Sequence, residues 1–166
     1  MRKVAMFRLF SKKTVLGNDL LMSQLYDEST FYRALYKDIA KAKHSVIIES
    51  PFLTIRRTRA ITPILKKLRR RNVNVTINTR LPRHHTPKLQ FEAEEAITVL
   101  KNAGVKVYVC KDLRHRKLAI IDSAILWEGS LNILSQSNSR EVMRRIESTK
   151  LCKQMLRFTR LESMYQ

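Results

Sequence analysis

Apolar and polar residues alternate along this chain with two periods, one typical of helices and one typical of strands. Phe31, Leu35 and Ile39 lie four residues apart, which predicts a helix that Ser29 or Thr30 caps at its start. The same reasoning predicts further helices around 59–71 and 86–104, and strands over 44–53, 73–78 and 105–109. Helices and strands therefore alternate as far as residue 109, which favours parallel strands joined by helices.

The last third of the chain has a different pattern. Apolar residues over 118–122 and 125–127 flank Ser123 and Ala124, which predicts a hairpin, and a strand over 141–146 and a helix over 151–161 follow. The expected fold class is α/β, with a mixed, largely parallel β-sheet flanked by helices on both faces. We assign residues 28–166 to a single domain and residues 1–27 to an N-terminal extension whose role the sequence leaves open.

The charge narrows the range of partners. The 166 residues include 33 Lys and Arg against 14 Asp and Glu, which gives a net charge of +19, and 44% are hydrophobic, as in a folded domain. Such an excess of positive charge favours polyanions, first nucleic acid and second anionic membrane surfaces. A structural role of the ribosomal type fits the charge equally well, but it leaves the motif between residues 115 and 132 unexplained.

The cysteines and histidines exclude some kinds of site. Cys110 and Cys152 are too few for a disulfide framework or a four-cysteine zinc site, and Cys110 ends an apolar run, where a buried thiol is expected. His84 and His85 are adjacent, and neighbouring side chains rarely bind the same metal ion. We therefore expect a solvated loop that contacts the substrate rather than a metal site. No segment has the length of a membrane-spanning helix and the N-terminus is a poor secretory signal, so we expect a cytoplasmic protein without stable membrane insertion.

The strongest chemical signal lies between His115 and Asn132, in the sequence HRKLAIIDSAILWEGSLN. Alternate side chains of a strand share a face, so His115 and Lys117 point the same way, and Ser130 and Asn132 share one parity. An ammonium, a hydroxyl and a carboxamide suit the oxygens of a phosphate, and an imidazole attacks phosphorus or moves a proton. Asp122 has the opposite parity, so we expect it to be structural, for example as the partner of a basic side chain.

This arrangement resembles the signature of the phospholipase D superfamily, in which His-x-Lys-x4-Asp precedes a Gly-Ser-x-Asn segment. A basic surface strand with an ordinary histidine is the plainer alternative, and the concurrence of several motif elements disfavours it. The resemblance spans about residues 31–146 and implies a phospholipase D-like catalytic domain. The residues that match the signature are His115, Lys117, Asp122, Gly129, Ser130 and Asn132.

The resemblance also implies a mechanism. In the family, one motif histidine attacks phosphorus to form a phosphohistidine and a second protonates the leaving oxygen, without a metal ion or another cofactor. His115 would then be the nucleophile, Lys117 and Asn132 would hold the non-bridging oxygens, and Ser130 would add a hydrogen bond. Glu141 resembles the acidic residue that orients the motif histidine in many relatives, and a plain surface glutamate is the alternative. Because this chain has one motif, the resemblance implies a homodimer whose composite site contains His115 of both subunits.

The family includes nucleases and lipid hydrolases, so the charge decides the expected substrate. We expect DNA cleavage of low sequence specificity, since no base-reading module is visible. The alternatives are a phospholipid (cardiolipin-type) hydrolase at a membrane surface and a non-catalytic nucleic-acid-binding module of the same fold. The cations expected to flank the site and to bind nucleic acid are Arg56, Arg57, Arg59, Lys66, Lys67, Arg69, Arg70, Arg80, Arg83, Arg114 and Arg116.

Overall fold

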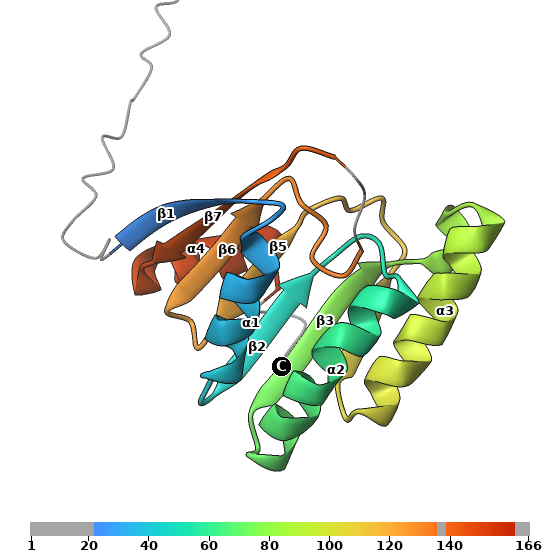
Figure 1. Ribbon diagram of the computed structural model, residues 1–166, viewed down its shortest axis with the longest axis horizontal. Coiled ribbons are helices and arrows are strands. Elements are labelled where there is room, and N and C mark those ends of the chain that lie inside the picture. Colours follow the sequence, from blue (N-terminus) through green and yellow to red (C-terminus); the bar gives the residue numbers. More distant parts are fainter. Residues whose placement is uncertain (1–21, 136–138, 162–166) are drawn as a thin grey trace, which may run out of the picture.

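The computed structural model describes residues 22–135 and 139–161, and Figure 1 shows how the elements in these ranges are arranged. Seven strands form one sheet, against which the helices pack. In chain order, the described elements are β1 (Met22–Asp27), α1 (Phe31–Ala40), β2 (Ser45–Glu49), α2 (Ile55–Arg70), β3 (Asn74–Arg80), the 3-10 helix η1 (Pro82–His84), α3 (Pro87–Asn102), β4 (Lys106–Cys110), β5 (Leu118–Ile121), β6 (Ile125–Gly129), β7 (Val142–Glu147) and α4 (Thr149–Thr159).

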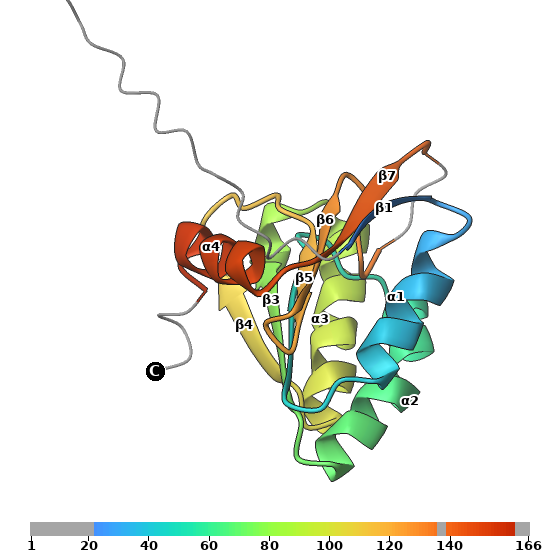
Figure 2. The ribbon, with the colours of Figure 1, turned by 90° about the vertical axis from the view of Figure 1, so that its left-hand side faces the viewer.

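The sheet has the strand order β1-β7-β6-β5-β2-β3-β4, and helices cover both of its faces. Figure 2 shows α1, α2 and α3 on one face and α4 on the other. The expected α/β class, with a mixed sheet between two layers of helices, is confirmed. The expectation of a largely parallel sheet is wrong: β2 and β4 run parallel to β3, and the other four neighbouring pairs are antiparallel.

The lengths of the connections explain this change of direction. Parallel neighbours need a crossover of a dozen or more residues, and α2 and α3 supply the crossovers between β2, β3 and β4. Residues 111–117 contain no helix, so the chain that leaves β4 crosses the carboxyl ends of β3 and β2 and enters β5 antiparallel to β2. The predicted hairpin between β5 and β6 is confirmed, with Ile121 opposite Ile125.

The start of the described chain lies in the sheet, since β1 pairs with β7. The last six residues of the expected extension 1–27 are therefore part of the domain, and residues 1–21 lie outside the described residues. Helix α1 begins close to the predicted position, but Thr30 makes no side-chain capping bond. Instead, hydrogen bonds from Thr30 and Ser29 to the carboxylate of Asp27 organise the preceding turn and lower the pKa of Asp27 to about 2.

Two apolar layers hold the strands between the helices. The larger layer lies under α1, α2 and α3 and includes Trp127 and Phe31, the largest fully buried side chains. The smaller layer lies under α4 and includes Leu118 and Ile120 of β5. Because β5 is covered on both faces, its sequence is a continuous apolar run rather than an alternating one. Its position in the centre of the sheet fixes the segment that precedes it.

Candidate functional site

The candidate site is built on the segment that connects β4 to β5 across the carboxyl ends of β3 and β2. Glu49, the last residue of β2, lies beneath this segment and is fully buried. Its carboxylate accepts hydrogen bonds from Arg116 Nε at 3.2 and 3.1 Å, and Arg114 Nη1 lies 3.5 Å from it. Alternate side chains of extended backbone point in opposite directions, so these ion pairs hold two arginines on one side and leave His115 and Lys117 on the other.

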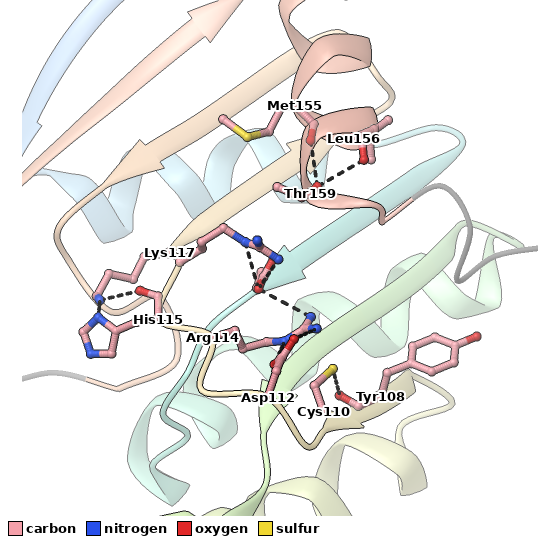
Figure 3. Close-up of polar contacts among 11 residues, drawn as sticks. Tyr108, Cys110, Asp112, Arg114, His115, Lys117, Met155, Leu156 and Thr159 are labelled. Atoms are coloured by element: carbon pink, nitrogen blue, oxygen red, sulfur yellow. Dashed lines mark hydrogen bonds and ion pairs between the residues drawn. The ribbon is translucent and has the colours of Figure 1, made fainter.

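His115 and Lys117 contact each other, as Figure 3 shows. Lys117 Nζ lies 2.7 Å from His115 Nδ1 and donates a hydrogen bond of 2.8 Å to the His115 carbonyl oxygen. An ammonium group has donors only, so Nδ1 acts as the acceptor and the ring proton is on Nε2. The pair therefore places a neutral imidazole beside a positive charge.

The surroundings of this pair favour the neutral form of the histidine. Partial burial lowers the pKa of the His115 imidazole, and the charges of Lys117 and Arg80 lower it further. Burial also lowers the pKa of Lys117, while the carboxylate of Glu141 opposes that shift. A histidine whose pKa lies below the usual 6.5 is mostly neutral at neutral pH, and the neutral ring is the nucleophilic form.

The glycine and serine of the motif lie where β6 ends against β7. Gly129 leaves no room for a side chain, because a Cβ atom there would clash with the backbone carbonyl oxygen of Val142. Ser130 Oγ accepts a hydrogen bond of 3.2 Å from the Val142 N–H. Hydrogen bonds from Ser130 and Ser139 hold the pKa of Glu141 below its usual range, and attraction by Lys117 acts in the same direction. Strand β7 thus brings Glu141 close to the lysine and serine of the motif.

Asn132 is held by α1 and by the loop between β2 and α2. Its backbone carbonyl accepts a hydrogen bond of 2.7 Å from the hydroxyl of Tyr32. Two residues later, Leu134 donates to Ser50 Oγ at 3.1 Å and accepts from the Thr54 N–H at 2.8 Å. The side-chain Oδ1 of Asn132 is buried without a hydrogen-bond partner among the described residues. Buried polar groups normally have partners, so this carboxamide is available to a ligand.

Two aromatic residues complete the surroundings of His115. The ring of Phe52 meets the imidazole of His115 edge-on, with centroids 5.6 Å apart, and lies 4.9 Å from the ring of His85. Burial and the charge of Arg80 lower the pKa of His85. The motif contains no hint of Phe52 or of Glu49. The available signal was their position at the carboxyl end of a strand, since ligand sites of open α/β sheets form there.

Asp122 lies at the other end of the sheet, in the turn between β5 and β6. Its carboxylate accepts backbone N–H hydrogen bonds from Lys43, His44 and Ser45, all at 2.7–2.8 Å. Burial would raise the pKa of Asp122, but these hydrogen bonds outweigh it and leave the pKa below its ordinary value. This geometry fits the structural role that the parity predicts, with backbone N–H groups in place of the expected basic side chain.

Some of the cations expected to bind nucleic acid lie at the site. Arg80 ends β3 next to His115, and Arg83 follows on η1, where it is exposed. Arg114 is engaged by Asp112 and Glu49, and only 11% of its side chain is exposed, so it acts in anchoring the crossing segment. Arg116 shares the same carboxylate and is more exposed.

The cations of α2 are spread along the helix. Arg56 is exposed near the site, Arg57 lies over the ring of Tyr32 at 3.4 Å, and Arg59 pairs with Glu95 at 2.9 Å. Lys66, Lys67, Arg69 and Arg70 lie farther along the helix, and their expected role in binding nucleic acid stays a prediction. Helix α2 starts at the site end, and at about 1.5 Å per residue Lys66 lies about 17 Å further along its axis.

Three further observations concern the described ranges alone. In them, no group of three or more His, Cys, Asp and Glu residues could hold a metal ion. None of their helices is both long enough and apolar enough to cross a membrane. Cys110 is buried, as predicted, and burial raises the pKa of its thiol.

The role of Glu49 as an anchor can be tested through stability. We expect Glu49→Gln to lower the free energy of unfolding by about 3 kcal/mol, because breaking a buried ion pair leaves charge uncompensated. Urea unfolding followed by the fluorescence of Trp127, the one tryptophan of the chain, measures this. Glu28→Gln is the matched control: its partner Arg140 is 97% exposed, so less than about 1 kcal/mol is expected. Equally small changes in both variants would contradict the anchoring role.

Solved structures share this fold at low sequence identity. Nuc, a phospholipase D family member from Salmonella typhimurium, is 20% identical with a TM-score of 0.68, covering 82% of this chain and 90% of its own. NucT from Helicobacter pylori is 23% identical with a TM-score of 0.65, covering 82% of this chain and 92% of its own. Phosphatidylserine synthase from Haemophilus influenzae Rd KW20 is 13% identical with a TM-score of 0.63, covering 86% of this chain and 38% of its own.

A family model identifies the group to which the chain belongs. Comparison with curated protein sequences gives no significant match. The model described as "Cardiolipin synthase, PLD-like domain" matches residues 35–161, which include all the residues of the His115–Asn132 motif. The match extends over most of the chain and agrees with the shared fold. The protein therefore belongs to the PLD-like domain family and, with it, to the phospholipase D superfamily.

Proposed function

We propose that this protein is a phosphodiesterase that cleaves DNA through a phosphohistidine on His115, without a metal ion, as a homodimer. The observation that carries the proposal is the contact of 2.7 Å between Lys117 Nζ and His115 Nδ1, with Glu141 beside the lysine and Ser130 bonded to Glu141. This group combines a neutral nucleophile with a fixed positive charge and uncharged hydrogen-bonding groups. Such a set suits attack on a phosphodiester, whose charge grows on the non-bridging oxygens.

In the first step, a ring nitrogen of His115 that holds a lone pair attacks phosphorus. The bond from phosphorus to the leaving oxygen breaks, and a second histidine gives that oxygen its proton. Lys117 turns from His115 Nδ1 to a non-bridging oxygen, which frees the lone pair and stabilises the developing charge. In the second step, a water molecule loses its proton to the second histidine and attacks phosphorus. The phosphorus–nitrogen bond then breaks and His115 is restored.

The second histidine is His115 of another copy of the chain. Each imidazole alone is mostly neutral at neutral pH, but two rings that meet across a two-fold axis share a proton, so that one is the nucleophile and the other the acid. An apolar groove of about 610 Å³ begins beside Lys117 and supports this pairing. Leu25, Val142 and Phe158 line it and are exposed. An exposed apolar patch next to an incomplete site favours a surface that a second subunit covers.

The charge of the chain supports a nucleic-acid substrate. The net charge is +19, and Arg80 and Arg83 lie on the strand and short helix next to His115. Phosphate contacts of this kind supply affinity without reading the base sequence, which agrees with low sequence specificity. The fold that this chain shares with Nuc and NucT further supports the proposal.

One observation favours a second candidate function, the hydrolysis of a phospholipid of the cardiolipin type. The apolar groove beside Lys117 would also accept an acyl chain, and the matching family model carries the name of cardiolipin synthase. The two functions are separated by incubating the protein with cardiolipin vesicles in the absence of DNA. Release of phosphatidic acid, together with failure to cut DNA, would replace the nuclease proposal by this one.

We expect His115→Ala to lower the rate of plasmid DNA cleavage in excess EDTA by about a thousandfold or more, because the nucleophile is lost. Binding of the same DNA, measured by fluorescence anisotropy, should be unchanged. His44→Ala is the matched control, because His44 is exposed and lies at the opposite end of β2, and it should cut at the wild-type rate. Cleavage by His115→Ala at the wild-type rate would refute the assignment, and a wild type that binds DNA without cutting it would indicate a non-catalytic binding module.

The subunit contact is tested by Phe158→Asp. Phe158 is 79% exposed and lines the groove, so a charge there should split the dimer and remove cleavage. Phe91→Asp is the control, since Phe91 is 69% exposed on α3, on the other face of the sheet, and should stay dimeric and active. Sedimentation equilibrium and plasmid cleavage measure both outcomes. A monomeric Phe158→Asp protein with full activity would contradict the composite site.

A further inference from the structure

Helix α2 is more basic than its place in the fold requires. Its sixteen residues carry seven Lys and Arg and no acidic residue. A helix benefits from cations mainly in its last turn, and like charges four residues apart, such as Lys66 and Arg70, are unfavourable. Cations of the last turn favour the helix dipole, but this does not account for all seven, so a binding partner that neutralises the excess charge is the natural explanation.

Several of these cations already serve the fold. Arg57 covers Tyr32, Arg59 pairs with Glu95, and Arg69 donates a hydrogen bond of 2.7 Å to the carbonyl of Val73. By contrast, Lys66, Lys67 and Arg70 are exposed, and the described residues provide no ion pair for them. We call these three residues the α2 patch.

The α2 patch lies at the end of the molecule opposite to His115. Figure 1 shows the carboxyl-terminal ends of α1 and α2 at the bottom, away from the segment that joins β4 to β5. Arg71 links these two ends by donating hydrogen bonds to the backbone carbonyls of Ala40 and Ala42. Exposed Lys41 and Lys101 lie at the same end. Asp122 contacts the loop after α1, but its carboxylate already accepts three backbone N–H groups.

We infer that the α2 patch is a second nucleic-acid contact, which binds the phosphate backbone of the substrate away from the point of cleavage. The identity of the partner rests on the proposed function, whereas the charge and the position come from the structure. Shallow hollows of about 300 and 420 Å³ flank the patch, and Lys67 and Arg70 line both. A membrane-binding surface would mix cations with large apolar side chains, but the exposed large apolar residues that the structure describes lie on other elements.

This location makes the effect depend on the length of the nucleic acid. The patch begins about 17 Å beyond the start of α2, and a duplex rises about 3.4 Å per base pair. A hairpin with a stem of three base pairs, which is about 10 Å long, is therefore too short to contact His115 and the patch together, whereas a duplex of about forty base pairs can follow the surface from one to the other. The patch should strengthen the binding of long substrates and leave short ones unaffected.

The test uses the full chain with His115→Ala, so that DNA is bound without being cut. Lys66→Gln, Lys67→Gln and Arg70→Gln are combined, and the matched control combines Arg33→Gln, Lys153→Gln and Arg157→Gln, three exposed cations elsewhere. Circular dichroism confirms that both fold. Anisotropy with a 40-base-pair duplex and with a short duplex, the hairpin with a three-base-pair stem, is measured over a range of salt concentrations, and phosphatidylserine vesicles form a third arm.

We expect the patch variant to raise the Kd for the long duplex about tenfold or more at 0.1 M salt and to reduce the salt slope by about 2 to 3, because up to three phosphate contacts are lost. The short duplex and the control variant should change less than about twofold. An unchanged Kd for the long duplex, a change matched by the control, or loss of vesicle binding alone would overturn the inference. If the wild type cuts no DNA, the proposed function fails, but this comparison still decides the role of the patch.

Discussion

The ion pairs of the buried carboxylate of Glu49 with Arg114 and Arg116 are the interaction on which the site depends. They join the end of β2 to a segment that has no secondary structure of its own. A buried carboxylate without partners would be strongly unfavourable, so the two arginines and the carboxylate require one another. Because the segment is extended, fixing its arginines on one side fixes His115 and Lys117 on the other. Arg114 and Arg116, which the sequence suggests as nucleic-acid ligands, therefore act first by positioning His115 and Lys117.

The two halves of the sheet contribute differently to the site. The parallel half, β2 to β4, presents strand ends and supplies Glu49, Phe52 and Arg80. The antiparallel half supplies the motif residues that follow β6 and precede β7, where Gly129 allows close approach of the chains and Ser130 bonds to the start of β7. The crossing segment, residues 111–117, joins these two halves and carries His115 and Lys117 of the proposed site.

Much of this could be predicted from the sequence, because the relevant signals are local. Apolar spacing located α1 to α4 and the strands β2 to β7, but not β1, and the short Ser123–Ala124 link located the β5–β6 hairpin. The predicted parity of His115 and Lys117 agrees with their contact of 2.7 Å. The direction of the remaining strands could not be predicted by extending the early alternation, since it depends on the missing crossover helix between β4 and β5.

Other features required the fold itself. The position of Lys66 relative to His115 depends on the direction in which α2 runs, which periodicity does not contain. The role of Asp122 depends on the loop after α1, nearly eighty residues earlier in the chain, and its partners are backbone N–H groups rather than a recognisable side chain. Glu49 is a lone acid after an apolar run, and its importance appears only when β5 is placed beside β2.

The central claim is that the imidazole of His115 becomes bonded to phosphorus during turnover. It is tested most directly by stopping the reaction with DNA in alkaline denaturant, digesting the protein and measuring the mass of the peptide that contains His115. The account predicts a nucleotide adduct on His115 that is stable in alkali and is lost in acid. Cleavage of DNA without any adduct, or with the adduct on His85 or another residue, would contradict it.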